Sequence, residues 1–229
     1  MEKVLVIGAH PDDETLGVGG TIALHSRNGD KIYVLIFADG ESARSGGFNN
    51  IEKRQKQAKK ACALLGVTVL KFLNYPDQKL DTISLVDLAK QIEDIIRKWH
   101  PTIIYTHYGE DLNQDHKRIF DATLIAARPI PNSSVTQLIC YETLSSTDWN
   151  PMNKFHPNLF IDIDDVLEKK IKAFSQYKNE IMTYPHPRSK QGIMIRAQFW
   201  GSTVGVKHAE AFLRIREVIK KIKTMNIRS

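Results

Sequence analysis

Residues 3–14 read KVLVIGAHPDDE, and this stretch decides the fold. The apolar run Lys3–Ile7 is short and ends at Gly8, which is the pattern of a buried strand. A histidine and three acids follow, and the helical pattern of Glu14–Arg27 begins among them. The stretch therefore predicts a strand that runs directly into a helix, with polar side chains gathered at the carboxyl end of the strand.

The alternation of strands and helices continues along the chain. Further strands are predicted at Ile32–Phe37, Thr68–Phe72, Thr102–Thr106, Gln137–Tyr141 and Leu159–Ile163, and further helices at Ile51–Leu65, Leu85–Trp99, Asp115–Ala127, Val166–Tyr177 and Ala209–Lys223. Short links between alternating strands and helices predict an α/β fold, with a Rossmann-like, mostly parallel sheet and helices on both faces. Because no linker or repeat divides the chain, we expect a single domain over residues 1–229.

The composition excludes several classes of protein. Of the 229 residues, 42% are hydrophobic and 25% are charged, which is ordinary for a globular protein and unlike a disordered one. No apolar run approaches the ~18 residues of a transmembrane helix, and the apolar run at the N-terminus is too short for a signal peptide. Cys62 and Cys140 lie in apolar stretches and cannot form a disulfide framework. We therefore expect a cytoplasmic protein with two buried cysteines.

The net charge of +6 raises the question of a nucleic-acid partner. The basic residues do not gather on one face, because those of the second predicted helix go nearly round it: Lys53, Arg54, Lys56, Lys59 and Lys60. This pattern is typical of solvated helix faces, so we expect no nucleic-acid partner. A positive surface still attracts an anionic small substrate. The sequence is compatible with a homo-oligomer.

The polar segment after the first strand has the chemistry of a cation site. A dinucleotide site would need G-x-G-x-x-G at this place, but residues 8–14 contain one glycine and three acids, which repel phosphate groups. Asp13 and Glu14 would also suit a helix N-terminus, where the helix dipole favours negative charge. A histidine and three acids together nevertheless favour a metal site over a simple helix cap.

A second polar cluster supplies the missing ligands of a zinc site. Catalytic zinc takes three protein ligands, usually imidazole nitrogen and carboxylate oxygen, and His10 and Asp13 are two of them. Residues 107–116 contain two histidines at the end of another predicted strand, on the same edge of a parallel sheet. His116 is the preferred third ligand and His107 the reserve. The loops Asp39–Asn50 and Ser145–His156 are candidates for the rim.

Two motifs along the chain resemble a known family. HPDDE at 10–14, followed about a hundred residues later by Asp115-His116, resembles the LmbE-like (PIG-L) zinc-dependent N-deacetylases. Weaker matches come in the family's order: ADGE at 38–41, the helix that carries Arg54, FLNYPD at 72–77, and AEAF at 209–212, which resembles the start of its C-terminal helix. The resemblance implies an enzyme that removes an acetyl group from an N-acetylated amino sugar, often N-acetylglucosamine attached to another group.

The resemblance implies a role for each matching position. His10, Asp13 and His116 are similar to the family's zinc ligands, and Asp12 is similar to its general base. Zinc lowers the pKa of its bound water to about 7, and Asp12 lies beside a ligand, where it can accept the proton of that water.

The substrate contacts follow from the same resemblance. Arg54 and Asp77 are similar to residues that hold the sugar. We expect Glu41 and His107 to contact the substrate as well. The substrate itself is expected to be a small N-acetylated sugar conjugate.

The chain departs from the family at two positions. Many members have a histidine three positions before the last metal ligand, where this chain has Asn113, so that Asp115 lacks its usual imidazole partner. Asn113 can donate a hydrogen bond to the oxyanion, and His107 or His208 are the candidates to replace the ring. His208 is favoured because it precedes the predicted C-terminal helix. The second departure is Gln57, where an acid would help to orient the arginine.

Other functions are left as alternatives or excluded. The chain contains no G-x-S-x-G elbow and no Walker A pattern, which disfavours a serine hydrolase and a P-loop nucleotide-binding protein. A zinc amidase that cuts a non-acetyl amide or a thiol conjugate is one alternative. A non-catalytic sugar- or nucleotide-binding relative is another, although Asp12 would have no use in it.

Overall fold

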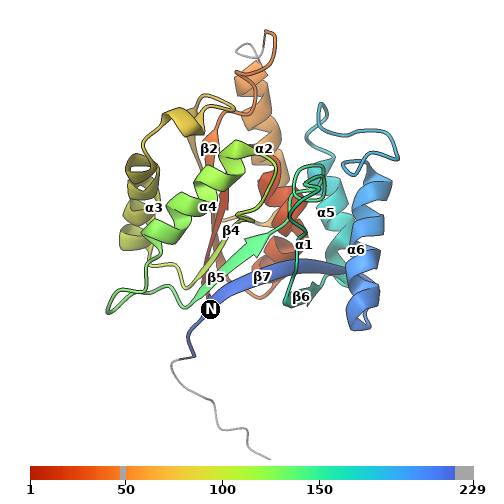
Figure 1. The fold of residues 1–229 in the computed structure, drawn as a ribbon. Coiled ribbons are helices and arrows are strands. Elements are labelled where there is room, and N and C mark those ends of the chain that lie inside the picture. Colours follow the sequence, from red (N-terminus) through yellow and green to blue (C-terminus); the bar gives the residue numbers. More distant parts are fainter. Residues whose placement is uncertain (47–49, 220–229) are drawn as a thin grey trace, which may run out of the picture.

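The computed structural model describes residues 1–46 and 50–219, and within them it contains a seven-stranded sheet (Figure 1). The spatial order is β3-β2-β1-β4-β5-β7-β6. The strands are β1 (Lys3–Gly8), β2 (Lys31–Ala38), β3 (Val69–Tyr75), β4 (Ile103–His107), β5 (Gln137–Tyr141), β6 (Leu159–Asp162) and β7 (Ala209–Glu217). The pairs among β1 to β5 are parallel, and only β7 runs antiparallel to its neighbours β5 and β6. The predicted mostly parallel sheet is confirmed.

Helices cover both faces of this sheet, as predicted. They are α1 (Asp13–Arg27), α2 (Ile51–Leu65), α3 (Leu85–Trp99), α4 (Gln114–Ala126), α5 (Leu167–Phe174) and α6 (Lys190–Val204), with the short 3₁₀ helices η2 (Leu80–Thr82) and η3 (Asp164–Val166). One hydrophobic core joins the sheet to α1, α2, α5 and α6, and a second joins it to α3 and α4. Figure 1 shows these two layers on opposite sides of the strands.

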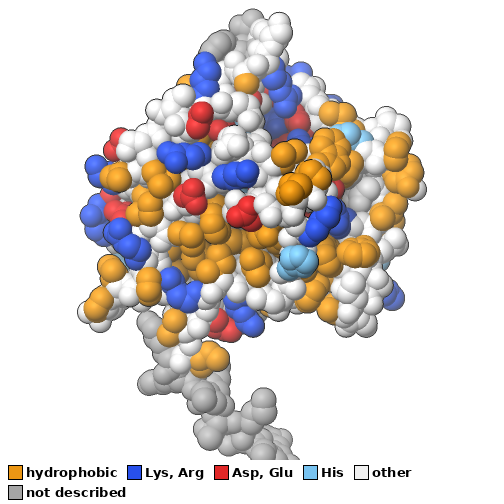
Figure 2. All heavy atoms as spheres, viewed as in Figure 1, with side chains coloured by type: hydrophobic (Ala, Val, Ile, Leu, Met, Phe, Trp, Pro, Cys, Tyr) orange, Lys and Arg blue, Asp and Glu red, His pale blue; other side chains and the backbone are white. Residues whose placement is uncertain are grey.

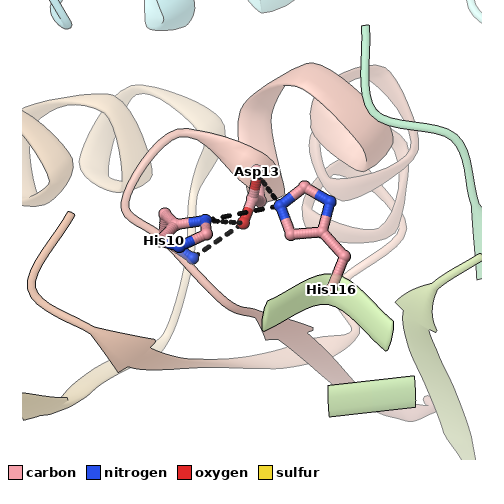
Figure 3. Close-up of side chains that lie close together, drawn as sticks. All are labelled: His10, Asp13 and His116. Atoms are coloured by element: carbon pink, nitrogen blue, oxygen red, sulfur yellow. Dashed lines mark hydrogen bonds and ion pairs between the residues drawn. The ribbon is translucent and has the colours of Figure 1, made fainter. Parts of the chain in front are cut away.

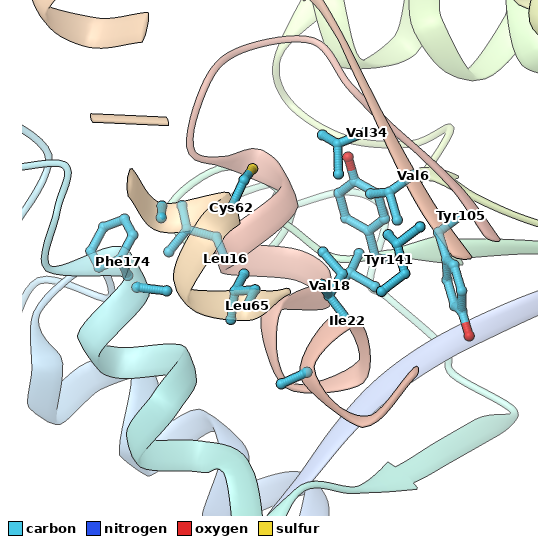
Figure 4. Close-up of a cluster of buried hydrophobic side chains, with 14 of the residues drawn as sticks. Val6, Leu16, Val18, Ile22, Val34, Cys62, Leu65, Tyr105, Tyr141 and Phe174 are labelled. Atoms are coloured by element: carbon cyan, nitrogen blue, oxygen red, sulfur yellow. The ribbon is translucent and has the colours of Figure 1, made fainter. Parts of the chain in front are cut away.

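The central strand β1 is held from both faces. Val4 and Val6 point into the core under α1 and α2, shown in Figure 4, whereas Leu5 and Ile7 point into the core under α3 and α4. All four side chains are fully buried, and burying such a side chain stabilises the fold by about 1.5–3 kcal/mol. The end of β1, where the polar segment begins, therefore stands on a rigid base.

A glycine lets α1 approach the sheet closely. A Cβ at Gly17 would lie 2.1 Å from Cδ2 of Tyr141 in β5, so that no larger residue fits without moving the ring. The Tyr141 hydroxyl donates a hydrogen bond of 2.7 Å to the Ile7 carbonyl. This packing fixes the first turn of α1 over the carboxyl ends of the central strands.

The C-terminal part of the chain differs from the prediction. The helix expected at Ala209–Lys223 is wrong, because Ala209–Glu217 forms strand β7, while residues 220–223 lie outside the described part. The sequence AEAFLRIRE is rich in helix-forming residues, but pairing with β5 on one side and β6 on the other overrides that local preference. The helix α6 was not predicted, since two glycines interrupt its apolar pattern.

Two smaller expectations concern the cysteines and membrane spans. Both cysteines are buried and free, as predicted. Among the helices of the described residues, none combines the length and the apolar character that crossing a membrane would take.

Candidate functional site

The carboxyl ends of β1 and β4 lie side by side and bring three side chains together. His10 follows β1, Asp13 begins α1, and His116 lies in the first turn of α4. Figure 3 shows the three side chains pointing toward one another. His10 Nδ1 lies 3.3 Å from His116 Nε2, and the Asp13 carboxylate lies 3.5 Å from each of these nitrogens. All three residues are at least 94% buried, with exposed fractions of 6%, 1% and 1%.

These separations fit a small divalent cation. Ligand atoms about 2.1 Å from a tetrahedral ion are separated from one another by about 3.4 Å. The distance between the two nitrogens, 3.3 Å, matches this value within about 0.1 Å, and each Asp13 oxygen lies 3.5 Å from one of the nitrogens. The residue types also match, since imidazole nitrogen and carboxylate oxygen are common ligands of such ions.

A carboxylate stands behind each imidazole of this group. His10 Nε2 lies 3.0 Å from Asp115 Oδ2 and 3.1 Å from Asp77 Oδ1, and His116 Nδ1 lies 3.2 Å from Asp111 Oδ1. The carboxylates favour a proton on these outer nitrogens, which leaves the lone pairs of the inner nitrogens facing each other. Two such lone pairs repel unless a proton or a metal ion lies between them, and a carboxylate behind each imidazole is typical of metal centres.

The charges around His10 also favour a cation. Burial alone would lower the pKa of His10, but its hydrogen bonds to Asp115, Asp13 and Asp77 raise the pKa well above the usual value. The neighbouring acids therefore stabilise positive charge at this ring, whether a proton or a metal ion carries it.

A second group, His10 with Asp77 and Asp115, also brings possible ligand atoms together. The Asp115 oxygens already accept the backbone N–H groups of Gln78 at 2.9 Å and Leu80 at 3.0 Å. Asp115 is thus the orienting partner of His10. The sequence did not show which imidazole pairs with Asp115. In the structure this imidazole is that of His10.

Asp111 is a buried residue of this site that sequence reasoning did not single out. Its carboxylate faces His116, accepts the backbone N–H of Asn113 at 2.8 Å, and accepts the hydroxyls of Ser146 and Thr147. Burial raises the pKa of Asp111, but His116 and the hydroxyl donors lower it to about 2. The ionised carboxylate therefore connects the rim loop Ser145–His156 to a candidate metal ligand.

Asp12 stands beside the three ligand atoms in an unusual backbone conformation. Its φ of 132° lies in a region that non-glycine residues rarely adopt. The Asp12 N–H donates to Glu14 Oε2 at 3.0 Å, and the Asp12 carbonyl accepts from Thr15 and Leu16. Burial raises the pKa of Asp12 to about 6, against the lowering influence of Arg54 and Arg188. A carboxylate of that pKa is suited to accept a proton near neutral pH.

Arginines form the opposite wall of the site. Arg54 Nη2 lies 3.0 Å from Asp12 Oδ2, and its Nη1 lies 2.6 Å from Glu180 Oε1. Glu180 also pairs with Arg44 at 2.8 Å and with Arg188 at 3.1 Å. The guanidinium of Arg54 lies over the Tyr177 ring, 5.1 Å from its centre. Glu180 therefore orients Arg54. In the family an acid at the position of Gln57 would help to do this, and Gln57 has no carboxylate.

The two walls enclose a polar cavity of about 80 Å³. It is lined by His10, Asp12, Gly40, Arg44, Arg54, Asp77, Gln78, Asn113, His116, Glu180 and Arg188. The rim loop Asp39–Asn50 contributes two of these residues. The charged lining residues that were not expected from the sequence are Arg44, Glu180 and Arg188, which lie in irregular segments without a motif.

Asn113 occupies the position where the family resemblance expects a histidine. It caps the N-terminus of α4, and its Oδ1 accepts the Asp115 N–H at 2.8 Å. Asn113 also lines the cavity, and because its oxygen is held in this way, the amide NH₂ is the group that remains for a ligand. Asn113 can therefore donate a hydrogen bond to a group bound there.

Three predicted site residues lie elsewhere. His107 is fully buried, stacked 3.9 Å beneath His116, and its Nε2 accepts the Ala9 N–H at 2.9 Å. Burial, together with the charge of His116, lowers the pKa of His107 to about 4. His107 therefore does not line the cavity, where a substrate contact was predicted for it, and its ring supports the site from below.

Glu41 and His208 do not line the cavity either. Glu41 is buried behind Arg44, 3.8 Å from its guanidinium. His208 Nδ1 faces Asp164 at 2.6 Å. Because the segment after His208 is strand β7 and not a helix, it does not bring this ring over the site.

Comparisons with known proteins agree with this geometry. Residues 5–127 match the family model described as PIG-L, GlcNAc-PI de-N-acetylase. The uncharacterised deacetylase YaiS of Escherichia coli K12 is 30% identical over 182 residues, which cover 77% of this chain and 90% of that protein. The diacetylchitobiose deacetylase of Thermococcus kodakarensis is 25% identical over 222 residues, covering 92% of this chain and 82% of that protein.

A solved structure shares the fold. N,N'-diacetylchitobiose deacetylase from Pyrococcus horikoshii superposes with a TM-score of 0.78 at 23% identity, over 98% of this chain and 88% of that chain. The single-sheet α/β architecture is therefore that of known deacetylases.

Proposed function

The chain belongs to the PIG-L family of de-N-acetylases, and from this premise we propose that it is a zinc-dependent hydrolase which removes the acetyl group from an N-acetylated amino sugar or its conjugate. The observation that carries the proposal is the position of Asp12. Its carboxylate lines the same cavity as His10 and His116 but stays outside the three converging ligand atoms. A metal centre with a separate base beside it can activate water for hydrolysis.

His10, Asp13 and His116 would hold the zinc ion. Bound there, zinc supplies a Lewis acid that polarises a carbonyl and makes water more acidic. The distances among the three side chains and the carboxylates behind both imidazoles support this assignment.

Asp12 moves the proton in the proposed reaction. A water molecule adds to the acetyl carbonyl carbon, and Asp12 takes the proton that this water releases. The C–N bond then breaks, and Asp12 delivers the proton to the amine nitrogen, so that the products are acetate and a free amine. Arg54 and Arg188 hold the Asp12 carboxylate at 3.0 and 3.3 Å, which fixes the direction of both transfers.

The remaining cavity residues bind and orient. The Asn113 amide donates to the oxygen that becomes negative, a contribution of about 3–4 kcal/mol for a well-placed donor. Asp77 offers an acceptor to hydroxyl groups of the sugar, and Arg54, which also lines the cavity, fixes Asp12 and Glu180 beside it. The polar lining suits a carbohydrate rather than an apolar ligand.

The test is a measurement of released acetate. The zinc-loaded protein is incubated with N-acetylglucosamine, with N,N'-diacetylchitobiose and with N-acetylglucosaminides that carry an anionic group, with Asp12→Asn as the control. We expect acetate and amine in equal amounts from at least one sugar, and little from the control. Cleavage of other amides without any acetate from this panel would favour the alternative, a zinc amidase of different specificity.

A further inference from the structure

The proposed reaction places negative charge on the acetyl oxygen. The site lacks a free imidazole that could stabilise this charge by donating a hydrogen bond. Asn113 is neutral. Among the described residues, the histidines that line the cavity are His10 and His116, and both belong to the metal-ligand group. His107 and His208 do not reach the cavity. A cationic donor must therefore come from the arginine wall.

Arg54 and Arg44 are poorly placed for this task. Arg54 is only 2% exposed, and its guanidinium is committed to Asp12 and Glu180 beneath the Tyr177 ring. Arg44 stands at the rim with a side chain that is 46% exposed. Its guanidinium pairs with the acids Glu180 and Glu41, and no contact joins it to Asp12 within the described part of the chain.

Arg188 combines the features that the other two arginines lack. Its Nη1 lies 3.3 Å from Asp12 Oδ2 and 3.1 Å from Glu180 Oε2. Its Nε donates to Ser145 Oγ at 2.7 Å and to the Leu144 carbonyl at 3.3 Å. The guanidinium is thus held at two of its three nitrogens, Nε and Nη1.

The third nitrogen of the guanidinium, Nη2, stays free for a ligand. Arg188 lines the cavity with a side chain that is 20% exposed, and its Nη2 has no hydrogen-bond partner in residues 1–46 and 50–219. Because Nε and Nη1 are fixed, the N–H groups of Nη2 are oriented before a substrate arrives, which is what makes such donors effective in stabilising a transition state.

We infer that Arg188 is a catalytic residue of the proposed reaction, and that its Nη2 donates to the acetyl oxygen as negative charge develops there. This rests on the proposed deacetylase function. A guanidinium stays charged at all working pH values and donates in a plane, so that it replaces the charge of the missing imidazole but not its proton transfer. Both proton transfers then remain with Asp12, which Arg188 also contacts.

The first test compares Arg188→Gln and Arg188→Lys with wild type, all loaded with zinc. Arg188→Gln should lower kcat about 100- to 1,000-fold, leave KM within about threefold, and keep one zinc per chain. Arg188→Lys keeps the charge and should retain more of the rate. The matched control is Arg196→Gln, because Arg196 is a partly exposed arginine paired with Asp148 and Glu142 outside this cavity.

A second readout does not depend on turnover. The affinity for a phosphonate analogue, in which a tetrahedral anion replaces the acetyl carbonyl, should fall in Arg188→Gln by a factor similar to the loss in kcat/KM. The affinity for the free amine product should stay unchanged.

Other outcomes overturn the inference. A rise in KM at constant kcat would make Arg188 a substrate-binding residue, and a parallel loss of zinc or of thermal stability would make it a structural one. Wild-type protein that releases no acetate would refute the proposed function. Active wild type with a fully active Arg188→Gln variant would refute this inference alone.

Discussion

The two walls of the cavity are built in different ways. The metal-ligand wall, His10, Asp13 and His116, comes from the ends of two adjacent parallel strands and the first turns of the helices that follow them. The arginine wall takes Arg44 and Arg188 from irregular segments, with side chains that are several times more exposed. A metal centre would tolerate little variation in distance, and the rigid sheet supports the three candidate ligands. The arginine wall does not have to hold three atoms at fixed distances from one ion.

Charge separates the two walls as well. The metal-ligand wall concentrates acids around His10 and His116, a balance that a divalent cation completes. The arginine wall carries its own counter-charges, because its three guanidinium groups pair with Asp12, Glu180 and Glu41. On the outer face seen in Figure 2, Lys and Arg side chains are interspersed with Asp and Glu. Metal loss should therefore affect the first wall far more than the second.

The largest effect is expected from removing a ligand. Asp13→Ala should abolish stoichiometric zinc binding and deacetylation together, and its loss of zinc affinity should exceed the ~10- to 100-fold typical of an outer partner. Zinc titration into chelator-treated protein measures this. Asp165→Asn is the control, since Asp165 lies in an exposed ion pair with Arg27. Full zinc binding by Asp13→Ala would remove Asp13 from the ligand set.

The second-largest effect is expected at Asp12, and it distinguishes the role of the base from that of the metal ligands. Asp12→Asn keeps the size of the side chain but cannot accept a proton, so kcat should fall ~100- to 10,000-fold while zinc content stays at one per chain. Acetate release and metal analysis on the same sample measure both. Near-normal turnover by the zinc-loaded variant would assign the base role to another group.

A smaller effect tests the support behind His116. Asp111→Asn retains hydrogen bonding but loses the charge that faces Nδ1, so zinc affinity should fall about 10- to 100-fold. At saturating zinc most of the activity should return. An unchanged zinc affinity would show that the carboxylate serves only to anchor Ser146 and Thr147.

The smallest effect is expected at the rim of the arginine wall. Arg44→Gln removes an ion pair of a half-exposed side chain, so the free energy of unfolding should change by less than about 1 kcal/mol, and less in high salt. Chemical denaturation at two salt concentrations measures it. A loss well above this value would mean that the arginine wall is as tightly coupled as the metal-ligand wall.

The sequence predicted the metal-ligand wall for a physical reason. His10 and Asp13 are close in sequence, and the parallel sheet places the ends of neighbouring strands at one edge, so His116 could be added without coordinates. Glu180 and Arg188 could not be predicted, because they reach Asp12 and Arg54 only through the folded chain. β7 was mistaken for a helix because its local preference is helical, and this error also misplaced His208.

The most direct test of the central claim is anomalous diffraction at the zinc absorption edge from crystals of the zinc-loaded protein. One strong peak per chain is expected, within about 2.3 Å of His10 Nδ1, His116 Nε2 and an oxygen of Asp13, with Asp12 outside bonding distance. A peak at another group of residues, or none among these three side chains, would contradict it.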